Sequence, residues 1–365
     1  MAKKRFVSFL LTLFIGLLGG FSFQVMHLPI PWLLGPMLFS LAGSRLWKSF
    51  TPYWPGALRD SAIIMVGYTI GLSFTMAALQ QIGQQLLSMI LLTAMVLLGA
   101  MGIGFLVSKA ASIPFPTVLL GSIPGGLSQM LPLAEEIEGV DLTVVTFLQV
   151  SRLLMVIFFV PLLIFSPFFG LEGMQHAADL QKAAGSWNGL FPNILVYAVV
   201  CPACAILGKK VRFPSAFFLG PMISTILINL SGFAGPQLPS VLLNASQLMI
   251  GCYIGLLLKP EQLKNKLSIT VLAFLSGIVL IGCSLGISYL LTRLHDVSLL
   301  TAFLGLSPGG MDQMGIIAKE VHADMSVVIC YQLFRTLFIF LVVPSLIKFI
   351  FRSRLRGKTA EKAAG

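Results

Sequence analysis

The chain has 365 residues, of which 57% are hydrophobic and only 10% are charged. Apolar stretches of about 20 residues, each long enough to span a bilayer, recur along it, which excludes an ordinary soluble domain. The net charge of +11 does not indicate nucleic-acid binding, because the basic residues lie at the ends of apolar stretches and no basic face or recognition fold accompanies them.

The first half of the sequence predicts six apolar elements, at about residues 6–23, 31–46, 60–78, 86–107, 115–133 and 143–165. The fifth contains Pro124, Gly125 and Gly126. Proline removes a backbone donor and glycine adds backbone freedom, so a helix is expected to break there. In hydrocarbon, such a break is tolerated only where protein or a water-filled cavity receives the freed polar groups.

The second half repeats this pattern. Pro308, Gly309 and Gly310 follow the first Pro-Gly-Gly segment at an offset of 184 residues. The segments Leu34–Met37 and Gly67–Gly71 recur as Leu219–Met222 and Gly251–Gly255, and Asp141, Gln149, Arg152 and Pro161 recur as Asp324, Gln332, Arg335 and Pro344. The offset drifts only from 185 to 183. We interpret this as an internal duplication, with a first membrane repeat at 1–184 and a second at 185–365 that ends in a basic cytoplasmic tail.

The distribution of lysine and arginine favours one topology. If each broken element enters and leaves on the same side, each half crosses five times and the halves have opposite orientations. Nearly all basic residues then lie on the cytoplasmic side with both termini, and the outer side keeps only Lys182, Arg293 and Lys319. If the broken elements cross fully, the basic clusters at 209–212 and 259–266 move outside. The prediction is therefore an all-α polytopic membrane protein of two inverted repeats, each with five transmembrane helices and one re-entrant broken helix.

Two buried charges and four amides are candidate ligand contacts. Arg152 and Arg335 lie about ten residues into their helices, where a charge is costly and usually faces a partner or an aqueous cavity. An anion contact and a structural pairing with an acid such as Asp141 both fit. Gln149 and Gln332 share a helix face with the arginines, and Gln129 and Gln313 follow the breaks by three residues. Their alternative role is hydrogen bonding between helices.

Asp312 is the acidic residue at a break, where the first half has Ser128. A carboxylate there could bind Na⁺ or carry a proton, or it could cap the following half-helix. The predicted substrate-binding set combines all of these positions: Pro124, Gly125, Gly126, Ser128, Gln129, Gln149, Arg152, Pro308, Gly309, Gly310, Asp312, Gln313, Gln332 and Arg335. The four histidines are scattered and have no carboxylate cluster beside them, so we expect no metal, no cofactor and no catalytic residues.

The duplicated Pro-Gly-Gly-x-x-Gln-Met motif, together with Leu-Gly-Pro-Met in the second helix of each half, resembles the bacterial AbrB membrane family, which is defined by such a duplication. The resemblance covers nearly the whole chain. It implies a role in regulating aidB expression, and members are also labelled ammonia monooxygenases. The sequence lacks the clustered imidazoles that a copper enzyme needs and a DNA-reading element, so regulation would be indirect.

The sequence therefore predicts a secondary transporter of the bacterial inner membrane that moves a small, anionic solute, with H⁺ or Na⁺ coupling left open. The alternative is a membrane sensor that affects gene expression through a partner. The expected partners are a small-molecule substrate and the lipid bilayer, without nucleic acid, and a homo-oligomer is compatible with both functions.

Overall fold

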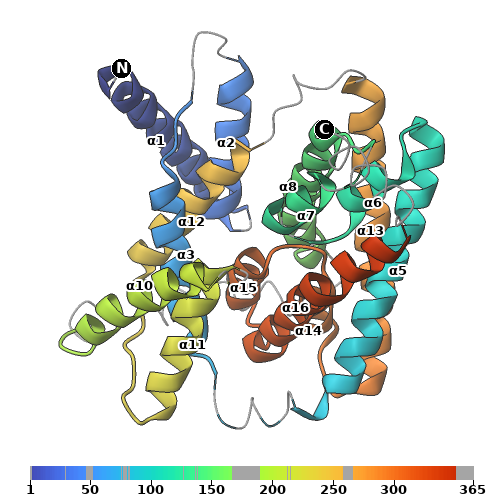
Figure 1. The fold of residues 1–365 in the computed structure, drawn as a ribbon. Helices are drawn as coiled ribbons and strands as arrows, with labels where there is room; N and C mark the ends of the chain where they lie inside the picture. The colour runs from blue at the N-terminus through green and yellow to red at the C-terminus, as the bar shows by residue number, and fades with distance from the viewer. Residues whose placement is uncertain are drawn as a thin grey trace, which may run out of the picture. The chain divides into compact units, whose positions relative to one another are not determined.

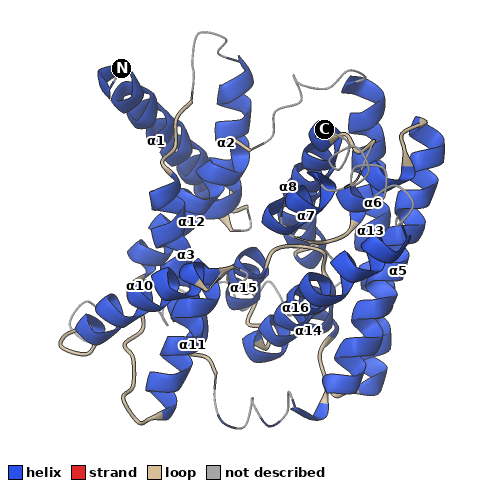
Figure 2. Cartoon of the chain, in the orientation of Figure 1, coloured by secondary structure: helices blue, strands red, loops and turns tan. Residues whose placement is uncertain are grey.

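The computed structural model describes residues 2–28, 30–46, 52–74, 76, 80, 83–125, 127–135, 137, 139–166, 190–211, 213, 215–257 and 266–350. The described residues form helices joined by loops and turns, without a strand (Figure 2). The all-α class expected from the sequence is thus confirmed. The predicted repeat boundary near Ala184 lies outside the described residues.

The helices of the first half are α1 (Ala2–Val25), α2 (Pro31–Leu46), α3 (Gly56–Gly71), α5 (Leu86–Ala111), α6 (Phe115–Ser122), α7 (Leu127–Glu135) and α8 (Leu142–Ile164). Those of the second half are α10 (Ile194–Lys210), α11 (Ala216–Leu230), α12 (Ser240–Gly255), α13 (Lys266–Leu294), α14 (Leu299–Leu306), α15 (Met311–Glu320) and α16 (Met325–Ile350). Figure 1 shows this order by colour.

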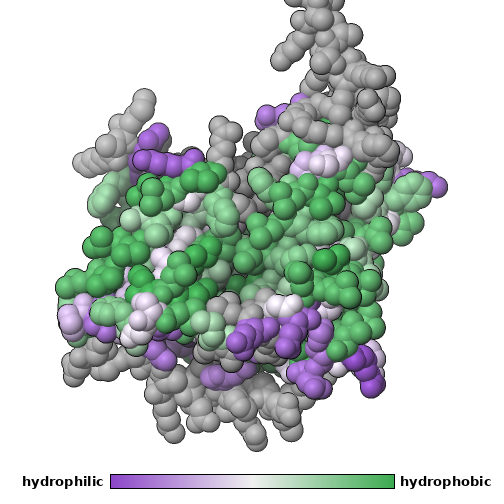
Figure 3. All heavy atoms as spheres, turned by 60° about the horizontal axis from the view of Figure 1, so that its bottom comes forward, coloured by the Kyte–Doolittle hydropathy of each residue, from purple (hydrophilic) through white to green (hydrophobic). Residues whose placement is uncertain are grey.

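Among the described residues, five helices are long and apolar enough to cross a membrane: α1, α5, α8, α13 and α16. The helices α2, α3, α10, α11 and α12 have 15 to 17 residues. At 1.5 Å per residue they measure about 22–26 Å, somewhat less than a hydrocarbon core of about 30 Å. Apolar side chains cover much of the face drawn in Figure 3. Among the exposed apolar residues of α5 are Leu87, Leu98 and Leu106. Such a surface is stable against lipid rather than water.

Packing divides the chain into two compact units, each drawn from both halves of the sequence. The first unit comprises Met1–Gln84, Pro161–Leu258 and Asp312–Ile329, and the second comprises Gln85–Val160, Lys259–Met311 and Cys330–Gly365. The first unit therefore contains α1–α3, α10–α12 and nearly all of α15. The second contains α5–α7, α13, α14 and most of α8 and α16.

Glycines of α3 bring that helix into backbone contact with α11 in the first unit. A Cβ placed on Gly67 would lie 2.5 Å from the carbonyl oxygen of Phe218, and one on Gly71 would lie 2.8 Å from that of Met222. No side chain fits at these distances, so the two glycines set how closely the helices approach.

The second half makes the same contact in reverse. A Cβ on Gly251 would lie 2.4 Å from the carbonyl oxygen of Leu33, and one on Gly255 would lie 2.3 Å from that of Met37. Both partners belong to α2, the counterpart of α11. Glycines four residues apart therefore accompany close helix packing in both halves. The prolines of the Gly-Pro-Met segments, Pro36 and Pro221, lie inside continuous helices.

Candidate functional site

Both Pro-Gly-Gly segments interrupt a helix where the sequence predicts it. The helix α6 ends at Ser122 and α14 ends at Leu306, and the residues that follow, Ile123 and Ser307, have extended backbones with ψ of 129° and 135°. Each precedes a proline, whose ring disfavours the helical conformation of the residue before it. The local sequence is thus sufficient to end these helices, which leaves the last carbonyl groups of each without helical partners.

Two side chains of α8 receive the free carbonyl groups at the end of α6. Gln149 Nε2 donates to the carbonyl oxygens of Leu120 and Ile123 at 2.7 and 3.0 Å. Arg152 Nη1 donates to those of Gly121, Ser122 and Ile123 at 3.3, 3.1 and 2.8 Å, and its Nη2 donates to Gln149 Oε1 at 2.6 Å. The last three carbonyls of α6 and that of Ile123 after it therefore each have a donor.

The same arrangement holds the end of α14. Gln332 Nε2 donates to the carbonyl oxygens of Leu304 and Ser307 at 2.7 and 3.0 Å. Arg335 Nη1 donates to those of Leu306 and Ser307 at 3.3 and 2.5 Å, and its Nη2 donates to that of Gly309 at 2.8 Å and to Gln332 Oε1. The Gln-x-x-Arg pair of the following helix thus caps the C-terminus of each broken helix, where the helix dipole favours a cation.

The arginines are not explained by pairing with the preceding aspartates. Asp141 Oδ1 accepts from the backbone N–H groups of Thr143 and Val144, at 2.9 and 3.2 Å. Asp324 Oδ1 accepts from those of Ser326 and Val327, at 3.0 and 3.2 Å. Both carboxylates therefore cap the N-termini of α8 and α16.

The two capped breaks place positive charge inside the second unit. Arg152 and Arg335 are 8% and 3% exposed, and both belong to the second unit. Within the part of the chain that the structure describes, the one salt bridge joins Arg59 and Asp60, in the first unit. The Nε atoms of both arginines are buried and have no hydrogen-bond partner among the described residues. Among the described residues, the hydrogen-bond acceptors of these cations are backbone carbonyls and side-chain amide oxygens, which do not cancel the two positive charges.

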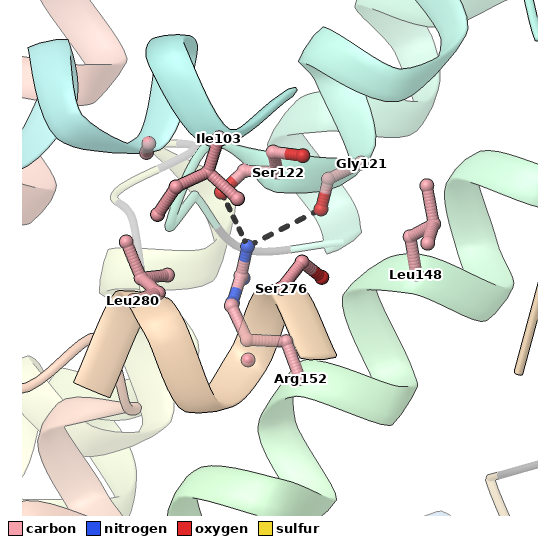
Figure 4. Close-up of a pocket in the computed structure, with 9 residues that line it drawn as sticks. Ile103, Gly121, Ser122, Leu148, Arg152, Ser276 and Leu280 are labelled. Atoms are coloured by element: carbon pink, nitrogen blue, oxygen red, sulfur yellow. Dashed lines mark hydrogen bonds between the residues drawn. The ribbon is translucent and has the colours of Figure 1, made fainter. Parts of the chain in front are cut away.

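A small cavity adjoins the first break. It is lined by Ser122 from the end of α6, by Arg152, by Ser276 of α13 and by apolar side chains that include Ile103 and Leu148. In Figure 4, the Arg152 guanidinium points from α8 toward the carbonyl groups of Gly121 and Ser122. The cavity holds about 10 Å³, which is room for roughly one water molecule. This conformation has no space there for an organic solute.

The remaining predicted residues fall in three groups. Pro124, Gly125 and Pro308 are buried at the breaks, and Gly309 and Gly310 are half-buried. Asp312 and Gln313 belong to the first unit, not the second, and Gln313 Nε2 donates to Asp312 Oδ2 at 2.8 Å. Gly126 and the side chains of Ser128 and Gln129 lie outside the described residues. The structure therefore places the Gln-Arg pairs at the breaks in the second unit, and it assigns Asp312 to the first unit.

Two polar features of the second break were not singled out from the sequence. The hydroxyl of Ser307 is buried without a partner among the described residues, and Tyr331, the residue before Gln332, takes part in a hydrogen-bonded cluster with Ser88. Comparing the two halves at their fixed offset would have found them, because the first half has Ile123 and Leu148 at these positions.

The fold and the capped breaks define a helical protein of the membrane type with an internally repeated, cationic interior site. A family model described as "Transition state regulatory protein AbrB" matches residues 32–351. The chain belongs to the AbrB family.

Two relatives match almost end to end. The chain is 28% identical over 340 residues to an Escherichia coli (strain K12) protein named "Putative regulator AbrB", covering 92% of this chain and 94% of that protein. It is 23% identical over 365 residues to the Bacillus subtilis (strain 168) protein named "Uncharacterized protein YhjN", covering 94% and 93%.

Proposed function

We propose that this protein is a secondary transporter of the bacterial inner membrane that moves a small organic anion. One observation carries the proposal: two buried guanidinium groups lie at two helix breaks of the same compact unit, and the described residues offer them no carboxylate. A charge held inside a membrane protein usually serves a ligand or a partner. Broken helices at corresponding places in two halves are typical of transport sites.

The helix termini at the breaks add to this preference. The half-helices α7 and α15 begin directly after the breaks, at Leu127 and Met311. Their first N–H groups lack helical partners and carry partial positive charge, which suits a carboxylate. The arginines meanwhile neutralise the negative ends of α6 and α14. At the first break this arrangement leaves net positive potential for a solute, whereas at the second break Asp312, in the first turn of α15, adds a carboxylate.

Contacts in both units support the inverted repeats that the basic residues favour. In the first unit, Gly67 and Gly251 pack against Phe218 and Leu33, which are themselves equivalent at an offset of 185 residues. In the second unit, α5 and α13 lie side by side (Figure 1). Ser88, in the first turn of α5, contacts His295, just beyond the end of α13. Equivalent helices that run antiparallel are what inverted topology requires.

This topology predicts opposite accessibility for two positions. With both termini cytoplasmic, a cysteine at Lys182 lies outside and one at Lys210 lies inside. A membrane-impermeant maleimide added to intact cells should label Lys182→Cys fully, and should label Lys210→Cys only after the membrane is opened, in a background where the native cysteines are replaced. Labelling of both positions from the same side would reject the inverted arrangement.

Transport requires a second conformation in this proposal. The cavity beside Arg152 holds about 10 Å³, so a solute reaches the arginines only when the helices around it move. Alternating access supplies such a movement by rearranging one group of helices against another. The occluded site is then one state of the cycle.

The test is a matched pair of solutes. Gluconate and sorbitol are both open-chain and differ only at one terminal carbon, a carboxylate in gluconate and a hydroxymethyl group in sorbitol, so we expect gluconate to raise the melting temperature of the purified protein and sorbitol not to. Stabilisation follows RT ln(1 + [L]/Kd), about 2.7 kcal/mol at one hundred times Kd. If gluconate fails, a panel of short mono- and dicarboxylates at equal ionic strength extends the test. An anion that stabilises should also show counterflow in proteoliposomes, and a panel without any stabilising or transported anion would overturn the proposal.

The alternative is a membrane sensor, and the word "regulator" in the relative's name favours it. A sensor would bind the same anion without moving it. Stabilisation by an anion without counterflow would therefore select this alternative. Either function involves a small-molecule ligand and the bilayer, and neither includes a catalytic step or nucleic acid.

A further inference from the structure

A hydrogen-bonded cluster joins three elements of the second unit beside the second break. Ser88 Oγ lies 2.8 Å from His295 Nε2, 3.0 Å from Tyr331 Oη and 2.7 Å from the carbonyl oxygen of Gln85. Ser88 and Tyr331 are buried, whereas His295 is partly exposed. The cluster thus leads from solvent-accessible imidazole to a phenol in the helix that caps α14.

Counting hydrogens shows how protonation acts on the cluster. The Ser88 hydroxyl has one hydrogen, and a carbonyl group can only accept. When Ser88 donates to the Gln85 carbonyl, its oxygen accepts from His295 Nε2–H and from the Tyr331 hydroxyl. An imidazolium must donate from Nε2, and its charge strengthens that hydrogen bond. A neutral imidazole can instead carry its hydrogen on Nδ1, and Ser88 must then turn away from Gln85.

The cluster is connected to the break through α16. Tyr331 directly precedes Gln332, whose amide donates to the carbonyls of Leu304 and Ser307. Arg335 follows Tyr331 by about one helical turn and donates to the carbonyl of Ser307 in the same cap. Holding Tyr331 against α5 and α13 therefore also holds the side chains that close the end of α14.

The first half lacks this cluster. At the offsets of the repeat, Tyr331 corresponds to Leu148 and His295 corresponds to Ala111. Leu148 packs tightly against Gly121, where a Cβ would lie 2.6 Å away. A cluster needed only for packing would not have to differ between the halves.

Few charged side chains of the described residues lie near His295. On its own segment the neighbours are Arg293, which donates to the Tyr289 hydroxyl, and Asp296; both are exposed. The start of α5 offers Ser88 and the N-cap residue Gln85, α14 carries no charged side chain, and α16 faces the cluster with Tyr331.

We propose that His295 is a proton-binding site that latches the second break: when protonated, it tightens the Ser88–Tyr331 link and fixes α16 against α5 and α13. Histidine is the side chain that ordinarily changes charge between about pH 5 and 8. The latch adds proton control to the transport proposed above. It makes a prediction about the break itself, which can fail while anion transport stands.

Hydrogen–deuterium exchange of the full-length protein in nanodiscs tests the latch without any solute. Amides of the segment 299–311 should be about fivefold more protected near pH 5.5 than near pH 8, after scaling for intrinsic exchange, as one strengthened hydrogen bond implies. His295→Gln, which keeps a donor but does not titrate, and Tyr331→Phe should each abolish the difference.

Two controls belong to the same experiment. The segment 115–125 at the first break should show no pH difference, and His27→Asn should behave as the wild type, since asparagine tolerates the left-handed backbone of His27. Equal protection of 299–311 at both pH values in the wild type would overturn the proposal. So would a pH difference that survives in His295→Gln. The wild-type comparison decides the matter even if a variant fails to fold.

Discussion

The first and second breaks share one cap and differ in what surrounds it. In both, a Gln-x-x-Arg pair from the following helix donates to the terminal carbonyls of the broken helix. The second break adds a buried Ser307 hydroxyl, the Tyr331 cluster and the carboxylate of Asp312, where the first half has Ile123, Leu148 and Ser128. The shared part is what an interrupted helix needs in order to exist in a membrane. The part that differs is where solute or ion specificity would be expected.

The half-helices that follow the breaks differ as well. After the first break, Met130 and Leu133 of α7 pack with Ile339 and Val343 of α16 inside the second unit. After the second break the chain passes into the first unit at Asp312, where Gly315 brings α15 against Ile70 of α3.

The largest expected effect is on the shared cap. Arg152→Gln and Arg335→Gln each leave buried carbonyls without their donor, at about 1–3 kcal/mol for each group that stays unsatisfied. Both should lower the free energy of unfolding by on the order of 3 kcal/mol or more, measured as melting temperature in detergent. Arg335→Lys, which keeps the charge but has a single donor nitrogen instead of a guanidinium, should recover part of this loss. Wild-type stability in both glutamine variants would show that the cap is dispensable and that the arginines serve a ligand alone.

A smaller effect tests whether the two halves are equivalent away from the breaks. Gly67→Ala and Gly251→Ala each force a Cβ to within about 2.5 Å of a backbone carbonyl oxygen, and overpacking of this kind costs about 1–3 kcal/mol. The two losses should be similar. Gly99→Ala in α5 is the control, because nothing lies within 4 Å of its Cβ. Unequal losses, or a loss at Gly99 as large as at Gly67, would contradict a symmetric contact.

The smallest effect on stability is expected at Asp312, where the breaks differ most in charge. Asparagine caps a helix as well as aspartate does, so Asp312→Asn should change stability by less than about 0.5 kcal/mol. It should nevertheless abolish the dependence of uptake on Na⁺ or on a pH gradient, because an amide neither titrates nor carries charge. Asp60→Asn, which alters a carboxylate in α3, is the control. Ion-dependent uptake that survives in Asp312→Asn would assign Asp312 to capping and leave coupling to other groups.

The sequence alone determined the helical class, the position of both breaks and the pairing of residues between the halves. These features depend on local chemistry: apolar length, the missing N–H of proline, and a constant offset between repeated motifs. The sequence also pointed to Arg152 and Arg335, because a charge about ten residues into an apolar helix is unusual and the repeat places both at equivalent positions.

Only the tertiary structure decided what those charges contact. The sequence left an anion or an aspartate as the partner of each arginine, and the structure gave them carbonyl groups about 30 residues earlier in the chain. It likewise placed Asp312 in a different unit from Arg335 and brought Ser88 to Tyr331 across 243 residues. Such contacts depend on how the helices pack, and packing chooses among many partners that hydropathy and spacing leave equivalent. A backbone carbonyl, present at every residue, leaves no mark in the sequence that would single it out.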